Sequence, residues 1–148
     1  MCLSVPLKLL NGHYKKKQHM FIQAAIDKAH QSPMNHKHGA VIVYRGKIIA
    51  SGYNYLQQHK TYSHSIHAEV AAIKDLLNNK EYRKIPHYKC ELYVVRIGKE
   101  SMGFPTKMSK PCGNCYKSCK KVGMKTIYWT TDDEFNISSS DNSSDDEY

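Results

Sequence analysis

Hydrophobic residues recur at helical spacing in three stretches of the 148-residue chain. In residues 15–32 four apolar side chains share one face, and Pro33 then ends the predicted amphipathic helix. The four side chains are Ile22, Ala25, Ile26 and Ala29. A second helix is predicted after His67, and a third spans the cysteine-rich residues 112–122, with Gly123 as its stop.

Strand patterns lie between and after these helices. β-Branched and aromatic residues bounded by turn residues predict five strands. They are residues 40–44, 47–51, 90–97, 125–131 and, folding back on the fourth as an antiparallel strand, 134–138. The order helix, two strands, helix, strand, helix, strand predicts an α/β fold. We expect a three-layer α/β/α sandwich around a mixed sheet of four to five strands.

The chain length suits one domain, which we expect to span residues 1–138. Residues 139–148 are acidic and rich in serine, a composition that predicts a disordered tail. No apolar run approaches the length of a membrane span, and the N-terminal residues lack the order of a secretory signal. Three of the five cysteines lie within eight residues, which favours a metal or redox role in a reducing compartment. We therefore expect a cytoplasmic protein without a membrane partner.

Charge is unevenly distributed along the chain. The first 131 residues hold all 22 lysines and arginines and six of the 13 acids, a balance of +16, whereas residues 132–148 hold seven acids. A body this basic favours an anionic partner, either a small nucleotide or a nucleic acid. The alternative is that surface lysines only maintain solubility, since lysine is a less specific phosphate ligand than arginine.

Two cysteines separated by two residues, Cys112 and Cys115, follow Pro111 directly. Such a pair can be a redox couple, half of a structural zinc site or part of a catalytic metal site. His67, at the start of the second predicted helix, would supply a third ligand and leave a fourth position for water, as in catalytic zinc sites. A site closed by Cys119 or by another histidine would instead be structural.

The segments His67-Ala68-Glu69 and Pro111-Cys112-Gly113-Asn114-Cys115 together resemble the zinc-dependent cytidine and deoxycytidylate deaminases, whose signature is H-x-E followed by P-C-x-x-C. The resemblance covers roughly residues 21–131, since the order of helices and strands is similar as well. It implies one Zn²⁺ per chain held by His67, Cys112 and Cys115, with water or hydroxide as the fourth ligand. It also implies that Glu69 is the catalytic proton carrier and not a ligand.

The same resemblance implies a hydrolase that converts the amino group of a cytosine nucleoside or nucleotide to a carbonyl with release of ammonia. Cytidine, deoxycytidine and deoxycytidylate are the expected small-molecule substrates. Asn54, after the second strand, matches an asparagine that holds the sugar or base in related enzymes, although asparagine is also common in turns. The resemblance also implies that the backbone N–H of Ala68 or of Cys112 orients the base.

The motifs leave the substrate open. Deoxycytidylate deaminases usually carry an asparagine shortly after H-A-E, where this chain has Ala71 and Ala72, and free cytidine deaminases typically have cysteine in place of His67. An antiparallel fifth strand would resemble the free-nucleoside branch of the family. Four basic residues near the cysteine segment would instead suit a phosphate or an RNA backbone. They are Arg96, Lys99, Lys107 and Lys110.

Two further hypotheses follow from the basic body. The first is a nucleic-acid base deaminase that acts on tRNA adenosine or polynucleotide cytosine. The second is a zinc-bound nucleic-acid-binding module without turnover, which would not need a carboxylate at Glu69. Association into a homo-oligomer is compatible with the sequence under all of these hypotheses.

Overall fold

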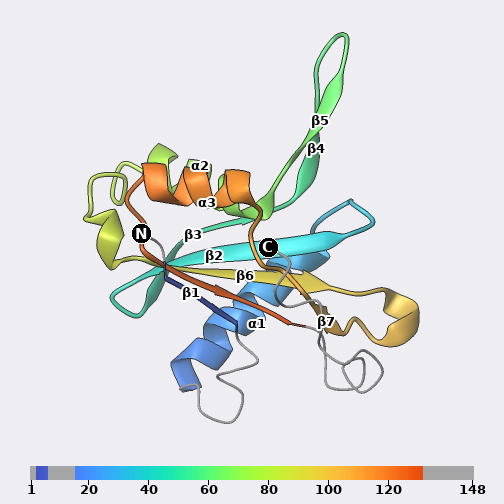
Figure 1. The fold of residues 1–148 in the computed structure, drawn as a ribbon, viewed down its shortest axis with the longest axis horizontal. Coiled ribbons are helices and arrows are strands. Elements are labelled where there is room, and N and C mark those ends of the chain that lie inside the picture. The colour runs from blue at the N-terminus through green and yellow to red at the C-terminus, as the bar shows by residue number, and fades with distance from the viewer. Residues whose placement is uncertain (1–2, 7–15, 132–148) are drawn as a thin grey trace.

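The computed structural model describes residues 3–6 and 16–131 and is built on one mixed sheet (Figure 1). Its strands lie in the order β1-β8-β6-β2-β3, and the short strand β7 pairs with β6. β2 is antiparallel to β3 and to β6, whereas β8 is parallel to both β6 and β1. The strands are β1 Leu3–Pro6, β2 Lys37–Tyr44, β3 Lys47–Tyr53, β6 Glu91–Ile97, β7 Thr106–Lys107 and β8 Thr126–Trp129.

Helices cover both faces of this sheet, which gives the expected three layers (Figure 1). α1 (Lys16–His30) packs on one face, and α2 (Ala68–Asn78) with α3 (Gly113–Lys121) packs on the other. Two short 3-10 helices, His87–Lys89 and Glu100–Met102, lie in the connections before and after β6. No helix in the described ranges has the length and apolar character that crossing a membrane requires.

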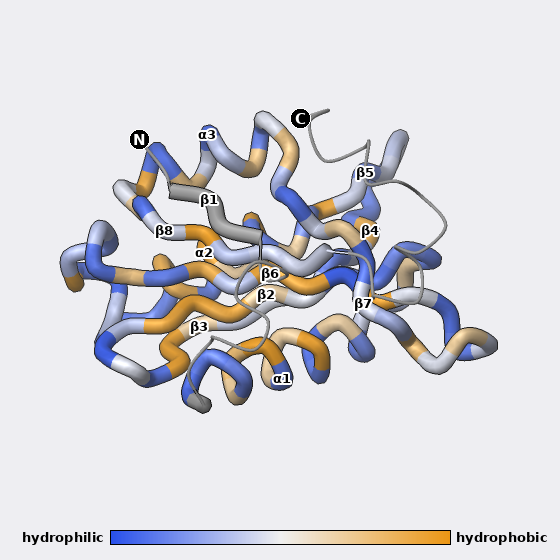
Figure 2. The backbone as a smooth tube through the Cα atoms, turned by 60° about the horizontal axis from the view of Figure 1, so that its bottom comes forward, coloured by the Kyte–Doolittle hydropathy of each residue, from blue (hydrophilic) through white to orange (hydrophobic). Residues whose placement is uncertain are grey.

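Alternating residues of the central strands supply the two cores. On β2, Val41 and Val43 face α1, whereas Ala40 and Ile42 face α2, and all four are buried. Both faces of the strand are therefore apolar, as expected for a strand covered by helices on each side. Figure 2 shows this concentration of hydrophobic residues along the central strands, with hydrophilic residues in the outer connections.

The predicted fold class is confirmed, and the predicted inner strands and three helices are present. α1 ends at His30, within two residues of the predicted end, and the Gly123 stop has the positive φ of 88° that favours glycine after a helix. The predicted strand 134–138 and the predicted tail 139–148 lie outside the described residues.

The sequence prediction missed a two-stranded antiparallel hairpin formed by β4 (Tyr55–Gln58) and β5 (Ser63–Ile66). Figure 1 shows it projecting away from the three layers. Its residues are mainly polar or aromatic, and only Ile66 is buried. Because little of its surface is covered, the alternation of buried and exposed positions that identifies most strands is absent.

The N-terminal strand β1 was also missed. It lies parallel to β8 and takes the place beside β8 that the sequence prediction gave to residues 134–138. β8 therefore has β6 on one side and β1 on the other. Four residues that end in proline carry almost no periodic signal, so only pairing with β8 identifies them as a strand.

Small residues bring α2 close to the sheet. A Cβ atom on Gly52 of β3 would lie 2.6 Å from the backbone nitrogen of Ala72 and 2.7 Å from Cβ of Ala71. Contacts this short are not tolerated, so glycine on the strand and alanines on the helix allow the close approach. Ala71 and Ala72, where deoxycytidylate deaminases usually carry an asparagine, thus have a packing role in this chain.

Candidate active site

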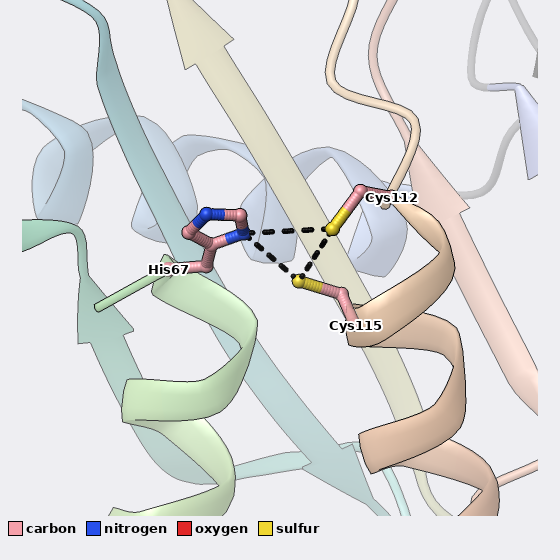
Figure 3. Close-up of side chains that lie close together, drawn as sticks. All are labelled: His67, Cys112 and Cys115. Atoms are coloured by element: carbon pink, nitrogen blue, oxygen red, sulfur yellow. Dashed lines mark hydrogen bonds between the residues drawn. The ribbon is translucent and has the colours of Figure 1, made fainter. Parts of the chain in front are cut away.

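The ends of two neighbouring helices bring His67, Cys112 and Cys115 together (Figure 3). His67 is the N-cap residue of α2, Cys112 is the N-cap residue of α3, and Cys115 lies in the first turn of α3. Nδ1 of His67 lies 3.1 Å from Sγ of Cys115 and 3.7 Å from Sγ of Cys112, and the two sulfur atoms are 3.5 Å apart. The three predicted ligands therefore form one cluster, although 45 residues separate His67 from Cys112.

This donor set fits a zinc ion. Tetrahedral zinc with bonds of about 2.0–2.3 Å to nitrogen and sulfur holds its ligand atoms about 3.5–3.8 Å apart, close to the distances in the cluster. One imidazole and two thiols are also ligands that zinc prefers. Burial raises the pKa of the Cys115 thiol, so a bound cation would be what holds this sulfur as a thiolate. Within the described ranges the cluster contains only these three residues, so it matches a site with an open fourth position.

Cys119 does not close the cluster. It is fully buried in the core between α2, α3 and the sheet, beside Leu76 and Met124. The four cysteines of the described ranges, Cys90, Cys112, Cys115 and Cys119, form no disulfide with one another. The hypothesis of a structural site closed by Cys119 is therefore wrong, and the redox-pair hypothesis leaves the position of His67 unexplained.

Glu69 lies beside the cluster without belonging to it. It is the second residue of α2, only 4 % exposed, and it lines the same cavity as His67 and Cys112. Burial raises the pKa of the Glu69 carboxyl above its usual value, and hydrogen bonds to its own backbone N–H and to Cys115 oppose this shift. A carboxyl group with a raised pKa next to a metal site is well suited to accept and return a proton.

The cavity has a volume of about 380 Å³ and extends from the cluster to the loop before β2. Besides the cluster and Glu69, its wall contains residues of the segment 34–38, the end of β3, the hairpin and the segment before α3. They are Met34, Asn35, His36, His38, Asn54, Ser65, Ala68, Ser109 and Lys110. The two residues predicted to contact substrate, Asn54 and Ala68, are both among them.

Asn54 also holds the cavity wall together. Its Oδ1 accepts a hydrogen bond from the backbone N–H of His38 at 2.8 Å, and its Nδ2 donates to the carbonyl of His36 at 2.7 Å. The side chain therefore fastens the start of β2 to the end of β3, a role that the sequence prediction did not include. Ala68 is the first residue of α2, where a backbone N–H has no acceptor within the helix.

A buried pair of hydroxyl groups, missed by the sequence analysis, supports the segment that carries Cys112. Oγ of Ser109 donates to the carbonyl of Val94 at 2.8 Å, lies 2.8 Å from Oγ1 of Thr130 and accepts from the backbone N–H of Thr130. Oγ1 of Thr130 donates to the carbonyl of Lys107 at 2.7 Å. The pair thus ties β6, β8 and the cysteine segment together. No motif signals it, because serine and threonine are common at strand ends.

Ser109→Ala should therefore lower the free energy of unfolding by about 1–2 kcal/mol, because it removes the hydrogen bonds of the Ser109 hydroxyl to Val94 and Thr130, while the Thr130 N–H keeps the carbonyl of Val94 as an acceptor at 3.2 Å. Urea denaturation of the zinc-loaded protein measures the change. Ser118→Ala is the matched control, since Ser118 lies on α3 and its hydroxyl bonds in an exposed position, and its effect should stay within about 0.5 kcal/mol. Equal stability of Ser109→Ala and the parent protein would contradict the role of the pair.

His38 makes the stability of the fold depend on pH. Burial, with a smaller contribution from the charge of Arg96, lowers the pKa of His38 from 6.5 to about 4. The folded state thus keeps His38 neutral while the unfolded state binds a proton, so this contribution is complete above pH 6.5 and is lost progressively as the pH falls toward 4. Between pH 7 and pH 5 the loss is at most about 2 kcal/mol.

We therefore expect His38→Gln to lose less stability than the parent protein when the pH is lowered from 7 to 5, as measured by urea denaturation at both values. His19→Gln is the control, because His19 is exposed on α1, and it should behave like the parent protein. An unaltered pH dependence in His38→Gln would show that His38 is not the group responsible.

Comparison with known proteins agrees with the metal site that the geometry indicates. The family model of the cytidine and deoxycytidylate deaminase zinc-binding region matches residues 15–131. The fold is similar to that of the dCMP deaminase from the cyanophage S-TIM5 in its apo form, with a TM-score of 0.58, 21 % identity and coverage of 84 % of this chain and 91 % of that one. The cytidine deaminase from Burkholderia pseudomallei has a TM-score of 0.53, 23 % identity and coverage of 74 % and 79 %.

The S-TIM5 dCMP deaminase in complex with dCMP and dUMP is also similar, with a TM-score of 0.55, 21 % identity and coverage of 80 % of this chain and 85 % of that one. No curated protein sequence matches the chain significantly. At these identities the solved structures establish a shared fold, while the family model covers the segments that contain all three members of the metal cluster.

Proposed function

The chain belongs to the cytidine and deoxycytidylate deaminase family and is a zinc-binding deaminase, and we propose that its substrate is a cytosine nucleoside or nucleotide. The reaction would replace the amino group on the cytosine ring by a carbonyl oxygen from water and release ammonia. The observation that carries this proposal is the position of Glu69, buried at the wall of a cavity of about 380 Å³ beside the three-residue metal cluster.

In this proposal His67, Cys112 and Cys115 hold the zinc ion, which when bound lowers the pKa of water toward neutrality. The Glu69 carboxylate accepts a proton from the attacking water as the new carbon–oxygen bond forms. It then returns the proton to the ring nitrogen. The proton that remains on the new hydroxyl group passes to the amino group, which allows the carbon–nitrogen bond to break. The products are a uracil compound and ammonia, so one water molecule accounts for all atoms.

Two further residues would orient the substrate. The backbone N–H of Ala68, at the first position of α2, is directed by helix geometry away from the helix interior and can donate to the base. Asn54 uses its amide to hold the loop of His36 and His38. Because Asn54 also lies in the cavity wall, we propose that its side chain contacts the sugar or the base of the substrate as well.

The experiment that tests the proposal measures ammonia release by the zinc-loaded protein with cytidine, deoxycytidine, deoxycytidylate, guanine, tRNA and single-stranded DNA. Glu69→Gln provides the blank. Release from a small cytosine compound supports the proposal. Release from guanine or from a polynucleotide alone would replace it by another deaminase activity, and silence on every substrate with zinc bound would favour a binding module without turnover.

We also propose a cytoplasmic location. The metal cluster needs Cys112 and Cys115 as reduced thiols, and neither forms a disulfide within the described ranges. A reducing compartment keeps such a closely spaced pair from oxidising to a disulfide. Fluorescence imaging of the tagged full chain in its source cells tests this location.

A further inference from the structure

Arg96 is a cation at the end of β6 for which the described residues provide no carboxylate partner. Its side chain is partly buried, and one of its terminal nitrogens donates a hydrogen bond to Nδ1 of His36 at 2.7 Å. Its Nε atom is buried and has no hydrogen-bond partner in the described ranges. A partly buried guanidinium with an unused donor is costly unless an anion completes its environment.

Among the described residues, the cross-strand partners of Arg96 carry no negative charge. They are His38 on β2 and Lys107 on β7. Like charges directly opposite each other on neighbouring strands are destabilising, so the Arg96–Lys107 pair is unfavourable by itself. Lys110 lines the same cavity, with its Nζ 5.5 Å from the centre of the Trp129 ring, and Glu69 is the only carboxylate among the described lining residues. An anion in this cavity would meet the positive charge of Lys110 in the wall and that of Arg96 behind His36.

Arg96 also determines which nitrogen of His36 carries a hydrogen. Arginine can only donate, so Nδ1 of His36 must accept, and the hydrogen of the neutral ring is on Nε2. His36 lines the cavity, which means that an N–H donor supported by a guanidinium charge is available in its wall. Such a charge-assisted donor is well suited to an oxygen of a phosphate group.

We propose that His36 and Lys110, with Arg96 behind His36, form the subsite for the phosphate of a cytosine nucleoside monophosphate, so that the chain prefers the nucleotide to the free nucleoside. The inference rests on the proposed function and names the substrate class of that same site. One cavity is lined by the metal cluster and Glu69 and also by His36 and Lys110. It can therefore take the base beside the metal cluster and the phosphate beside His36 and Lys110.

Arg96 acts through His36 in this arrangement, so it is a positioning residue. Its loss should lower the preference for the nucleotide without removing the groups that hold the base. The decisive quantity is thus the ratio of kcat/KM for deoxycytidylate to kcat/KM for deoxycytidine. The two substrates differ only in the phosphate, so the ratio measures the effect of the phosphate on kcat/KM. A loss of folded or zinc-loaded protein lowers both values equally and leaves the ratio unchanged.

The test compares the zinc-loaded parent protein with Arg96→Gln, Arg96→Lys and His36→Gln. We expect the ratio to fall about 10- to 100-fold in Arg96→Gln, as for loss of a hydrogen bond to a charged group. The fall in Arg96→Lys should be smaller, since the charge remains. Arg83→Gln is the matched control, because Arg83 is exposed beyond the C-terminal end of α2, and its ratio should equal that of the parent protein.

Binding of the products provides a readout that does not require turnover. Calorimetry should show that deoxyuridylate binds more tightly than deoxyuridine to the parent protein, and that Arg96→Gln and His36→Gln reduce this difference. An unchanged ratio and an unchanged difference in folded Arg96→Gln and His36→Gln would overturn the subsite. His36→Gln keeps the test meaningful if Arg96→Gln does not fold.

The same measurements distinguish a failure of the proposed reaction from a failure of the phosphate subsite. If the parent protein deaminates neither compound but binds deoxycytidylate more tightly than deoxycytidine, and Arg96→Gln abolishes that difference, the subsite stands and the proposed reaction is wrong. Turnover of single-stranded DNA alone, with binding that Arg96→Gln weakens, would overturn the assignment to a nucleoside monophosphate. The basic residues would then bind a polynucleotide backbone.

Discussion

Glu69→Gln should retain the fold and one zinc ion per chain while kcat for the cytosine substrate falls by about 10²–10⁴-fold, the contribution typical of general acid–base catalysis. The reason is geometric. Glu69 lies in the cavity beside the metal cluster but outside it, so an amide of the same size leaves the three proposed ligands in place and removes only the proposed proton acceptor. Steady-state ammonia release, with zinc content measured on the same samples, checks both parts of the prediction.

The control for this variant is Glu81→Gln. Glu81 is exposed beyond the C-terminal end of α2, whereas Glu69 is at the N-terminal end, so its loss should change kcat less than twofold. Glu69→Ala tests the same role with a smaller side chain and should be equally inactive. Turnover within tenfold of the parent protein in zinc-loaded Glu69→Gln would show that another group carries the proton.

Cys112→Ala and Cys115→Ala should each reduce the zinc content from one ion per chain to nearly none and abolish turnover. A tetrahedral site that loses one of three protein ligands binds its metal far more weakly, and the lost binding energy is also lost from folding. With free zinc at 100 times its dissociation constant, the stabilisation by zinc is about 2.7 kcal/mol, which for a chain of this size corresponds to about 5–10 °C in Tm. Metal analysis and thermal unfolding measure the two effects.

Cys119→Ala separates loss of the metal from loss of packing. Cys119 is fully buried in the core and lies outside the metal cluster. This variant should lose stability through the cavity it creates and still bind one zinc ion per chain. Chelation of zinc from the parent protein should lower its Tm and leave the Tm of Cys112→Ala unchanged. Full zinc content in Cys112→Ala would contradict the ligand assignment.

The two halves of the site come together through the packing of helices on one sheet. The motif around His67 starts α2 and the motif around Cys112 starts α3, and both helices lie on the same face of the sheet (Figure 1). Small residues at Gly52, Ala71 and Ala72 hold α2 close to β3, and the hydroxyl pair of Ser109 and Thr130 anchors the segment before α3. Precise placement of the ligands therefore depends on residues outside the motifs.

The sequence by itself was sufficient for the layers of the fold and the residues of the metal cluster. Hydrophobic periodicity predicts α1, and runs of β-branched and aromatic residues between turn residues predict the central strands, which are buried on both faces. The ligands His67, Cys112 and Cys115 could be predicted because each lies at a helix start and belongs to a short motif with a chemical requirement.

Only the tertiary structure decided the features that depend on contacts between distant residues. β1 is a strand because β8 offers its edge, and the hairpin of β4 and β5 is held by local pairing with little burial. The contact of Arg96 with His36 joins residues 60 positions apart, and Ser109 meets Thr130 from another element. Such polar contacts have no period and no fixed spacing, so their presence and their effect on the cavity follow only from the way the layers pack.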